Sequence, residues 1–326
     1  MSQTVLVTGG AGYVGSTLVT YLLHNRYKVI VLDNLSFGAE SLLGVWHHPE
    51  FTFIEGDVRD AAAVKNVFSA HAIDAIVHLA AIVGDPACAK QPDLAKSTNW
   101  DGSVNLLNQA RASKVKRFIF ASTCSNYGKM ADANSYVDEH SPLAPVSLYA
   151  ELKVKFENFL LEDKKGDLSP TALRFATVYG VSPRMRFDLT VNEFVKELAL
   201  GRELHVFGEK FWRPYCHVAD FARAIDLVLK SDREKVSHQV FNVGDTAENY
   251  QKQMIVDEIK KFIPQAKVRY TTKSEDPRDY RVSFAKINKE LGFTISKKVP
   301  DGIREIKYLI DHKVILNPDE AKYKNV

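Results

Sequence analysis

Residues 4 to 15, Thr-Val-Leu-Val-Thr-Gly-Gly-Ala-Gly-Tyr-Val-Gly, constrain the fold of this chain more than any other stretch. The apolar residues predict a buried strand, the spacing Gly10-x-Gly12-x-x-Gly15 predicts a tight turn, and residues 13–23 predict an amphipathic helix. In such a unit the glycines let the backbone approach a pyrophosphate, and the helix N-terminus offers free N–H groups. A glycine turn can also serve geometry alone. The strand before it and the helix after it favour a dinucleotide site instead.

The next β-rich run, residues 28–32, ends at Asp33. This aspartate lies near the offset of about 20 residues beyond the last glycine at which a carboxylate binds the 2′-hydroxyl of a ribose. Its negative charge would repel the 2′-phosphate of NADP, and the following Asn34-Leu35-Ser36 brings no basic side chain. The pattern therefore predicts NAD rather than NADP as the dinucleotide.

The composition is that of an ordinary globular protein, with 45% hydrophobic and 25% charged residues. A net charge of +3 argues against a dedicated nucleic-acid binder, which would carry a basic stripe. We see no apolar run of membrane-spanning length and no signal-peptide pattern, so we expect a cytoplasmic protein with no membrane partner. Cys88, Cys124 and Cys216 are far apart and odd in number, so neither a disulfide framework nor a metal site is expected.

β-rich runs alternate with helical patterns through the first 175 residues. The runs are residues 4–8, 28–32, 51–55, 74–79, 117–122 and 170–175, and the helical patterns are residues 60–70, 94–113 and 147–162. Such alternation predicts a parallel sheet with helices on both faces, and nearly continuous apolar runs are typical of strands buried on both sides. The predicted fold class is therefore α/β, a Rossmann-type doubly wound parallel sheet, with residues 1–175 as the NAD-binding domain.

Beyond Arg174 the alternation loosens. Helical patterns at 188–199, 218–230, 250–263 and 301–311 are separated by short strands and loops that contain proline. We expect residues 176–326 to form mainly a smaller, mixed α/β lobe that binds the substrate, and the chain could cross back between the lobes. We find no internal repeat and no low-complexity linker, so the two lobes are expected to share one continuous core.

Tyr149 and Lys153 open a predicted helix and lie on one of its faces, four residues apart. A free phenol has a pKa near 10 and is a poor base at neutral pH, but a nearby ammonium group and a positive nicotinamide would lower that pKa. Tyr149 could then accept a proton from a substrate hydroxyl as hydride leaves the carbon. Thr123, just after the run 117–122, could hold the same oxygen. A lone pair of this spacing is often a surface pair, but its place after the glycine turn and Asp33 favours catalysis.

Together these segments resemble an extended short-chain dehydrogenase/reductase of the nucleotide-sugar epimerase/dehydratase family, similar to UDP-galactose 4-epimerases, over nearly the whole chain. The resemblance is carried by Gly9-x-x-Gly12-x-x-Gly15, Asp33-Asn34, Asp57-Val58, Leu79-Ala80-Ala81, Asn99, Ser122-Thr123, Tyr127-Gly128, Tyr149-x-x-x-Lys153, Arg174-Phe175 and Arg213-Pro-Tyr-Cys-His217. It implies an enzyme with bound NAD, in which a Ser/Thr–Tyr–Lys set acts on a sugar hydroxyl. By this match, Thr123, Tyr149 and Lys153 are the expected catalytic residues.

The same resemblance implies the binding residues. The cofactor is expected to contact Gly9, Gly12, Tyr13, Val14, Asp33, Asn34, Asp57, Val58, Leu79, Ala80, Ala81, Asn99, Tyr149 and Lys153. Asp33 and Asp57 match residues at the adenosine half, and Tyr149 and Lys153 match residues at the nicotinamide ribose. The expected substrate is a nucleoside-diphosphate sugar, with contacts from Val83, Thr123, Cys124, Ser125, Thr177, Arg184, Arg186, Arg213 and Arg278. Arg213 matches an arginine that binds the diphosphate.

Departures from the family's patterns bear on the reaction. Dehydratases of the family carry Thr-Asp-Glu where this chain has Thr123-Cys124-Ser125, so 4,6-dehydration is disfavoured. Residues 81–88 and 181–189 look like a bacterial branch that includes GDP-heptose 4-dehydrogenases. We therefore expect hydride transfer at C4 with Tyr149 as the base, in a 4-epimerisation or a 4-dehydrogenation. Reduction of a 4-keto sugar is the alternative.

Some side chains leave alternatives open. Cys124 suits packing behind its strand better than nucleophilic attack, because no histidine lies near it in the sequence. Arg184 and Arg186 suit phosphate recognition and surface ion pairs equally. Either Arg278 or Arg281 could supply a further positive charge for the diphosphate.

Two further expectations concern the protein as a whole. Helices 97–113 and 147–162 have apolar faces that could be core only, but the resemblance implies that they pair across a homodimer. A non-catalytic nucleotide-sensing protein on the same fold is the rival to an enzyme. Such proteins commonly lack the tyrosine or the lysine of the catalytic set, whereas this chain keeps both Tyr149 and Lys153.

Overall fold

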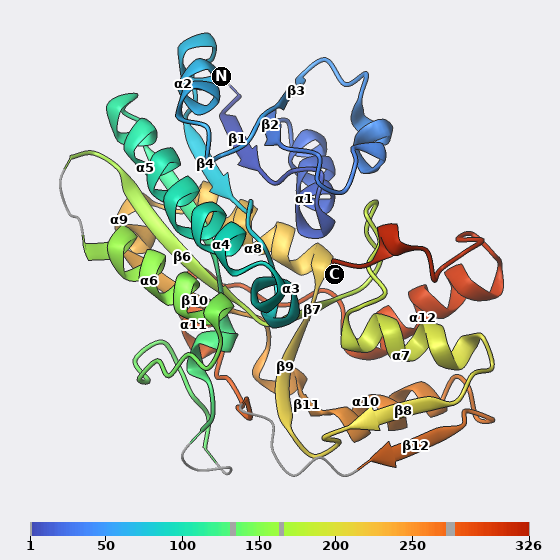
Figure 1. The fold of residues 1–326 in the computed structure, drawn as a ribbon. Helices are drawn as coiled ribbons and strands as arrows, with labels where there is room; N and C mark the ends of the chain where they lie inside the picture. Colours follow the sequence, from blue (N-terminus) through green and yellow to red (C-terminus); the bar gives the residue numbers. More distant parts are fainter. Residues whose placement is uncertain (1, 131–134, 163–165, 272–277, 326) are drawn as a thin grey trace.

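The computed structural model describes residues 2–130, 135–162, 166–271 and 278–325. At its centre is a seven-stranded sheet of parallel strands in the order β10-β6-β5-β4-β1-β2-β3 (Figure 1). The strands are β1 (Thr4–Thr8), β2 (Lys28–Asp33), β3 (Phe51–Glu55), β4 (Ala75–His78), β5 (Arg117–Thr123), β6 (Ser169–Phe175) and β10 (Gln239–Val243). The predicted doubly wound sheet is confirmed, and β10 is a strand that the sequence pattern did not indicate.

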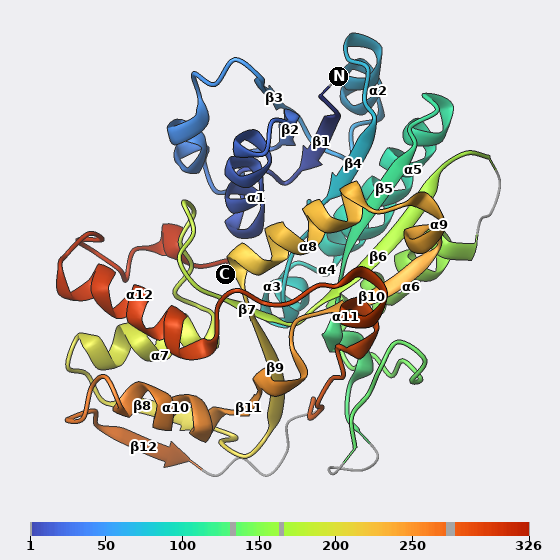
Figure 2. The same cartoon turned by 180° about the vertical axis from the view of Figure 1, so that it is seen from behind.

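Alternating side chains fill both faces of this sheet. In β1, Val5 and Val7 belong to one apolar core, and Leu6 between them belongs to the core on the other face. Helices α1 (Tyr13–His24) and α8 (Val218–Lys230) cover the first face (Figure 2). Helices α2 (Ala61–Ala70), α5 (Ser103–Ala112) and α6 (Leu148–Glu162) cover the second. Burial on both faces explains why the strands read as nearly continuous apolar runs.

The predicted helix over residues 94–113 is divided into three pieces. They are α4 (Pro92–Lys96), a π-helical turn (Ser97–Gly102) and α5. A Cβ atom at Gly102 would lie 2.8 Å from Cγ2 of Val58, so the helix approaches the end of β3 closely here. A π-turn widens a helix locally and often lies at a functional site.

The second lobe is the expected smaller, mixed α/β unit, and it has an apolar core of its own. Its sheets are β11 (Asn249–Gln251), β9 (Trp212–His217) and β7 (Thr177–Tyr179), and separately β8 (Leu204–Phe207) and β12 (Val268–Thr271). Its main helices are α7 (Thr190–Ala199), α10 (Lys252–Lys260) and α12 (Val299–Asp311). Shorter helices are η1 (Glu40–Val45), α3 (Asp85–Lys90), η3 (Cys124–Tyr127), α9 (Arg233–Val236), η4 (Thr246–Glu248), α11 (Ala285–Leu291) and η5 (Ala321–Tyr323).

The chain crosses between the two lobes more than once. β10 pairs with β6 in the large sheet, and α8 shares a core with α1, although both elements lie beyond residue 175. The alternation of strands and helices in the sequence loosens after residue 175, but the two lobes in space do not divide at that residue. Among the described residues, we find no helix with the length and apolar character needed to span a membrane.

Candidate functional site

The glycine turn lies at the carboxyl edge of the large sheet, against the end of β4. Gly9 has a φ of +75°, and a Cβ atom there would lie 2.8 Å from the backbone nitrogen of Ala80. A Cβ atom on Gly15 would overlap the carbonyl oxygen of Gly9. Gly12 is the N-cap of α1, and Val14 lies in the first turn. Close backbone approach therefore requires glycine at Gly9 and Gly15. Free N–H groups at a helix N-terminus such as that of α1 suit the phosphates of a dinucleotide.

Asp33 connects the end of β2 to the glycine turn. Its carboxylate accepts hydrogen bonds from the backbone N–H groups of Ala11 and Leu35, both at 2.9 Å. Burial raises the pKa of Asp33, and these two hydrogen bonds oppose the rise. The carboxylate thus lies beside the turn, where the sequence predicts an acceptor for a ribose hydroxyl.

Asp57 follows β3, the neighbouring strand. It accepts two hydrogen bonds from the Arg59 side chain, at 2.9 and 2.8 Å, and one from the Asn34 amide at 2.9 Å. The hydrogen bond with Arg59 is the main cause that lowers the pKa of Asp57 to about 2. Val58 is buried, and its carbonyl accepts a hydrogen bond from Asn105 at 2.8 Å. Residues predicted at the adenosine half are therefore neighbours at the β2 and β3 ends.

Two of the predicted cofactor residues use their side chains to hold the protein together. The Tyr13 hydroxyl donates to the carbonyl oxygen of Gly180 at 2.5 Å, so this side chain reaches into the second lobe and leaves the backbone for any cofactor contact. The Asn99 amide accepts from the backbone N–H of Ile82 at 2.8 Å and donates to its carbonyl at 2.9 Å. Asn99 thereby shapes the segment that continues from Leu79-Ala80-Ala81.

The three predicted catalytic residues come together at the edge that also carries the glycine turn. Thr123 ends β5, while Tyr149 and Lys153 lie one turn apart near the start of α6. The Thr123 side chain lies close enough to the Tyr149 phenol to oppose the rise in its pKa. The Lys153 ammonium lies 5.9 Å from the centre of the Tyr149 ring and donates to the carbonyl oxygen of Ala121 at 2.7 Å. This arrangement suits proton transfer between the Tyr149 phenol and a substrate oxygen.

Burial controls the ionisation of both α6 side chains. It lowers the pKa of Lys153 to about 8. Because this value still lies above 7, the ammonium remains largely charged at neutral pH. Burial also raises the pKa of Tyr149, and Asp85 raises it further, whereas Arg186 opposes the rise. In the protein alone, desolvation therefore keeps the phenol protonated. The expected lowering of the Tyr149 pKa requires the nicotinamide as well and stays a prediction.

A buried ion pair that the sequence analysis missed anchors α6 beneath the catalytic set. Glu157 of α6 pairs with Arg174 of β6 at 2.5 Å, and both side chains are at most 5% exposed. Ser122 donates to Glu157 at 2.5 Å, and Arg174 donates to Tyr127 at 2.9 Å. The helix is therefore fixed against β5 and β6. The available sequence signal was a glutamate that continues the four-residue spacing of Tyr149 and Lys153.

Arg213 approaches the site from β9 of the second lobe. Its guanidinium lies 5.2 Å from the centre of the Tyr280 ring, and Tyr280 donates to Ser125 at 3.4 Å. Arg213 also donates to the carbonyl oxygen of Trp212 at 2.6 Å. Two predicted substrate residues, Arg213 and Ser125, are therefore joined through Tyr280. Arg281 lies farther along, with its guanidinium 5.0 Å from the centre of the Trp212 ring.

Two further predicted arginines are each paired with an aspartate. Arg186 binds Asp188 through two hydrogen bonds of 2.9 and 2.7 Å. Arg278 forms an ion pair with Asp85 at 2.8 Å. The positive charge of each guanidinium is therefore already balanced within the protein.

Two of the predicted substrate residues make other contacts within the protein. The Cys124 side chain is 1% exposed and donates to the carbonyl oxygen of Arg174 at 3.2 Å, so it packs behind the strand. The Arg184 guanidinium lies 4.2 Å from the centre of the Phe37 ring and donates to Asn325 at 2.6 Å. Burial lowers the pKa of Arg184 to about 10. Both side chains are thus engaged elsewhere in the protein.

Val83 and Thr177 complete the predicted substrate set. Val83 lies in the segment between β4 and α3, and Thr177 begins β7, opposite Tyr215 of β9. Neither side chain is fully buried. Thr177 therefore lies beside the strand that carries Arg213.

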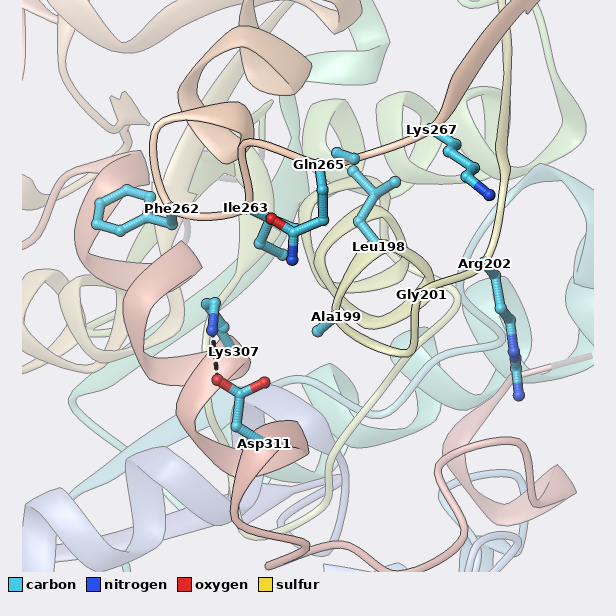
Figure 3. Close-up of a pocket in the computed structure, with 11 residues that line it drawn as sticks. Leu198, Ala199, Gly201, Arg202, Phe262, Ile263, Gln265, Lys267, Lys307 and Asp311 are labelled. Carbon is cyan, nitrogen blue, oxygen red and sulfur yellow. Dashed lines mark hydrogen bonds and ion pairs between the residues drawn. The ribbon is translucent and has the colours of Figure 1, made fainter.

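A separate surface pocket lies in the second lobe, between the ends of α7 and α10 and one side of α12 (Figure 3). Phe262, Ile263 and Leu198 provide its apolar wall, and Lys307 pairs with Asp311 on the α12 side. None of the predicted catalytic or cofactor residues lines it. The pocket is therefore distinct from the candidate site.

The glycine turn, the carboxylate after β2 and the Thr–Tyr–Lys set together define a short-chain oxidoreductase fold that uses a dinucleotide. Residues 5–244 match the model of the NAD dependent epimerase/dehydratase family. This chain belongs to that family. The resemblance drawn from the sequence motifs is therefore confirmed.

Several proteins similar to this chain are UDP-glucose 4-epimerases. A UDP-glucose 4-epimerase of Halalkalibacterium halodurans is 32% identical over 262 residues, which cover 74% of this chain and 75% of that protein. The crystal structure of UDP-glucose 4-epimerase with UDP-glucose from Thermotoga maritima has a TM-score of 0.85 and 28% identity, over 96% of this chain and all of that one. The Thermus thermophilus UDP-glucose 4-epimerase complex with NAD has a TM-score of 0.84 and 26% identity, over 96% of this chain and all of that one. The protein is an NAD-dependent enzyme, and the prediction of NAD is confirmed.

Proposed function

We propose that this chain is a nucleoside-diphosphate hexose 4-epimerase in which Tyr149 acts as the base. The observation that carries the proposal is the placement of the Lys153 ammonium, 5.9 Å from the centre of the Tyr149 ring and bonded to the carbonyl oxygen of Ala121 in β5, the strand that ends at Thr123. The matching proteins of Halalkalibacterium and Thermotoga are UDP-glucose 4-epimerases, which supports a UDP-hexose as the substrate.

The reaction begins with removal of a proton from the C4 hydroxyl of the sugar. Thr123 holds that oxygen, and Tyr149 accepts the proton in its phenolate form. NAD, when bound, supplies the acceptor for the hydride that leaves C4. Because burial keeps the Tyr149 phenol protonated in the protein alone, the phenolate depends on added positive charge. The oxidised nicotinamide ring, when bound, would add that charge beside the Lys153 ammonium.

The fate of the 4-keto sugar decides the net reaction. If the 4-keto sugar rotates in the site before hydride returns, hydride reaches the opposite face of C4 and the product is the C4 epimer. Release of the ketone would make the enzyme a 4-dehydrogenase, and the reverse direction would make it a 4-keto-sugar reductase. Loss of water needs an acid and a base beside the sugar, and the strand end Thr123-Cys124-Ser125 carries no carboxylate. The 4,6-dehydration reaction is therefore disfavoured.

We assign the diphosphate to Arg213. Its side chain is held against Tyr280 and is largely buried, so little conformational entropy is lost when it binds. A planar guanidinium presents two N–H groups in the geometry that phosphate oxygens accept. Arg278 and Arg186 lie on the same lobe, but each would first have to leave or share its aspartate.

The test identifies the bound nucleotide and then the product. Mass spectrometry of the denatured protein should detect NAD. NMR of reactions with UDP-, dTDP- and GDP-hexoses should show interconversion of the C4 epimers of one of them. Tyr149→Phe should lower turnover by about 10²- to 10⁴-fold, because the proton acceptor is lost, whereas Tyr308→Phe on exposed α12 should not. Full activity in Tyr149→Phe would overturn the mechanism.

We also propose a cytoplasmic homodimer that pairs through α5, α6 and the π-turn. Partly exposed Trp100 and Phe159 on this surface support the pairing, although Lys155 lies 3.7 Å from the Trp100 ring centre and covers part of it. Light scattering of the purified protein should give twice the mass of one chain. Trp100→Glu should shift it to one chain, and a native monomer would contradict the proposal.

A further inference from the structure

Asp85 is a carboxylate beside the catalytic set that the mechanism above does not use. It begins α3, directly after Gly84, whose φ is +96°. Ser147 donates to one carboxylate oxygen at 2.6 Å, and Arg278 of the second lobe pairs with the other at 2.8 Å. Ser147 precedes Tyr149 by two residues. Asp85 is therefore fixed between the start of α6 and the second lobe.

The contacts around α3 keep this carboxylate near the phenol. Cys88 of α3 is fully buried and shares a small apolar cluster with Leu152 and Tyr149 of α6. The charge of Asp85 acts on the Tyr149 phenol strongly enough to contribute to its raised pKa. Asp85 thus lies beside the start of α6, where the proposed reaction would bring the C4 hydroxyl of a sugar to Tyr149.

The neighbouring cations are each engaged by an aspartate. Arg278 pairs with one carboxylate oxygen of Asp85 at 2.8 Å, and Arg186, a guanidinium that acts on Tyr149, is held by Asp188 at 2.7 Å. A second carboxylate on the ligand would have to compete with Asp85 or Asp188 for these two side chains. Arg213 lies against Tyr280, on the side that we assign to the diphosphate.

We propose that Asp85 is a specificity-determining residue that favours neutral hexoses and disfavours hexuronic acids. This proposal rests on the proposed function, because it assumes that the sugar binds beside Tyr149. A carboxylate accepts hydrogen bonds from the hydroxyl groups of a neutral sugar. It repels a carboxylate at C6, and such a carboxylate would also have to displace Asp85 from Arg278.

The test compares two sugar nucleotides that differ only at C6, UDP-glucose and UDP-glucuronic acid. Calorimetry on the NAD-loaded protein should show tighter binding of UDP-glucose by about tenfold to a hundredfold, and kcat/KM should follow the same ratio. Asp85→Asn removes the charge at nearly constant shape and releases Arg278 from its partner. The ratio should then fall to within a few fold of one, mainly through tighter binding of UDP-glucuronic acid.

Two further variants separate selectivity from folding. Asp93→Asn on α4 removes an exposed carboxylate and should leave the ratio unchanged. Ser147→Ala keeps the charge of Asp85 but removes the bond that orients it, so it should weaken the discrimination only in part. Equal binding of both sugars by the native protein, or an unchanged ratio in Asp85→Asn, would overturn the role of Asp85 and leave the epimerase intact. Binding of both sugars without turnover of any hexose would instead overturn the proposed function.

Discussion

The cofactor half and the substrate half of the site are built from different kinds of group. At the cofactor half, the predicted binding groups are mainly backbone atoms of a glycine turn, and Asp33 is fixed by two backbone N–H groups. At the substrate half, the candidate groups are long charged side chains, and Arg186 and Arg278 are each held by an aspartate. The first half is set by local backbone geometry, whereas the second is set by ion pairs between distant segments.

This difference has a physical consequence. A backbone cradle tolerates few substitutions but depends little on charge, so we expect one carboxylate, Asp33, to decide which dinucleotide binds. A set of balanced ion pairs can be altered one charge at a time. When one member of a pair is replaced, the other keeps its charge and can pair with a ligand instead. We therefore expect variants in the substrate half to change selectivity, and variants in the cofactor half and catalytic set to remove function.

Lys153→Met should show the largest effect, since it removes the buried cation between the two halves. Turnover should fall by about 10²- to 10⁴-fold. Stability at pH 7 should rise, because the folded protein no longer buries an ammonium group whose pKa has fallen to about 8 from 10.5. At about 1.4 kcal/mol for each pKa unit, the gain is about 3 kcal/mol. Urea unfolding as a function of pH measures it.

The sign of this pH dependence is fixed by the two pKa values. Between pH 8 and 10.5 the folded native protein binds fewer protons at Lys153 than the unfolded chain, so native stability rises with pH across this window. The advantage of Lys153→Met should be full below pH 8 and disappear by about pH 10.5. Lys155→Met, on the exposed side of α6, should show neither effect. A variant less stable than the native protein at pH 7 would contradict the prediction.

Glu157→Gln should be the most damaging variant for stability in the cofactor half. It leaves Arg174 as an uncompensated buried cation beneath the catalytic set, which costs about 3–5 kcal/mol. Thermal unfolding of the NAD-loaded protein measures the loss. Glu151→Gln on the exposed side of the same helix is the matched control. A shift no larger than that of the control would show that α6 is positioned without this pair.

The arrangement of the cofactor half followed from the sequence more directly than that of the substrate half, because it depends on local backbone geometry and not on ion pairs between distant segments. The glycine turn and Asp33 lie within one strand–turn–helix–strand unit, so short-range patterns determine their positions. Arg184 was expected at the substrate, but its neighbours Phe37 and Asn325 lie far away in the chain. The fold class followed from the alternation of strands and helices. The strand β10 did not, because it joins the sheet after a long excursion through the second lobe.

Asp33→Ala tests the single carboxylate that distinguishes the dinucleotides. Loss of its acceptor should weaken NADH binding by about tenfold, which corresponds to one charge-assisted hydrogen bond of about 1.4 kcal/mol. NADPH binding should improve, because the repulsion of its 2′-phosphate is removed. Fluorescence titration measures both, with Asp93→Ala as the control. Tighter binding of NADPH than of NADH by the native protein would refute the assignment.

Glu305→Gln should have the smallest effect, in the part of the second lobe that supports β9. Glu305 accepts a hydrogen bond from His217 at 2.9 Å and pairs with Lys297. Burial raises its pKa, but these two partners outweigh burial and lower the pKa to about 2 from 4.5. The carboxyl is about one quarter exposed, so solvent screening limits its contribution to about 1 kcal/mol at pH 7.

The folded pKa of Glu305 lies below its unfolded value, so this stabilisation is full above about pH 4.5 and is lost as the pH falls toward 2. The difference in unfolding free energy between native protein and Glu305→Gln should therefore shrink over that window. Glu320→Gln, which removes an exposed ion pair, should show a smaller difference at pH 7. An equal difference at pH 7 and pH 3 would mean that the carboxylate charge does not stabilise β9, and that shape alone positions His217 and the strand that carries Arg213.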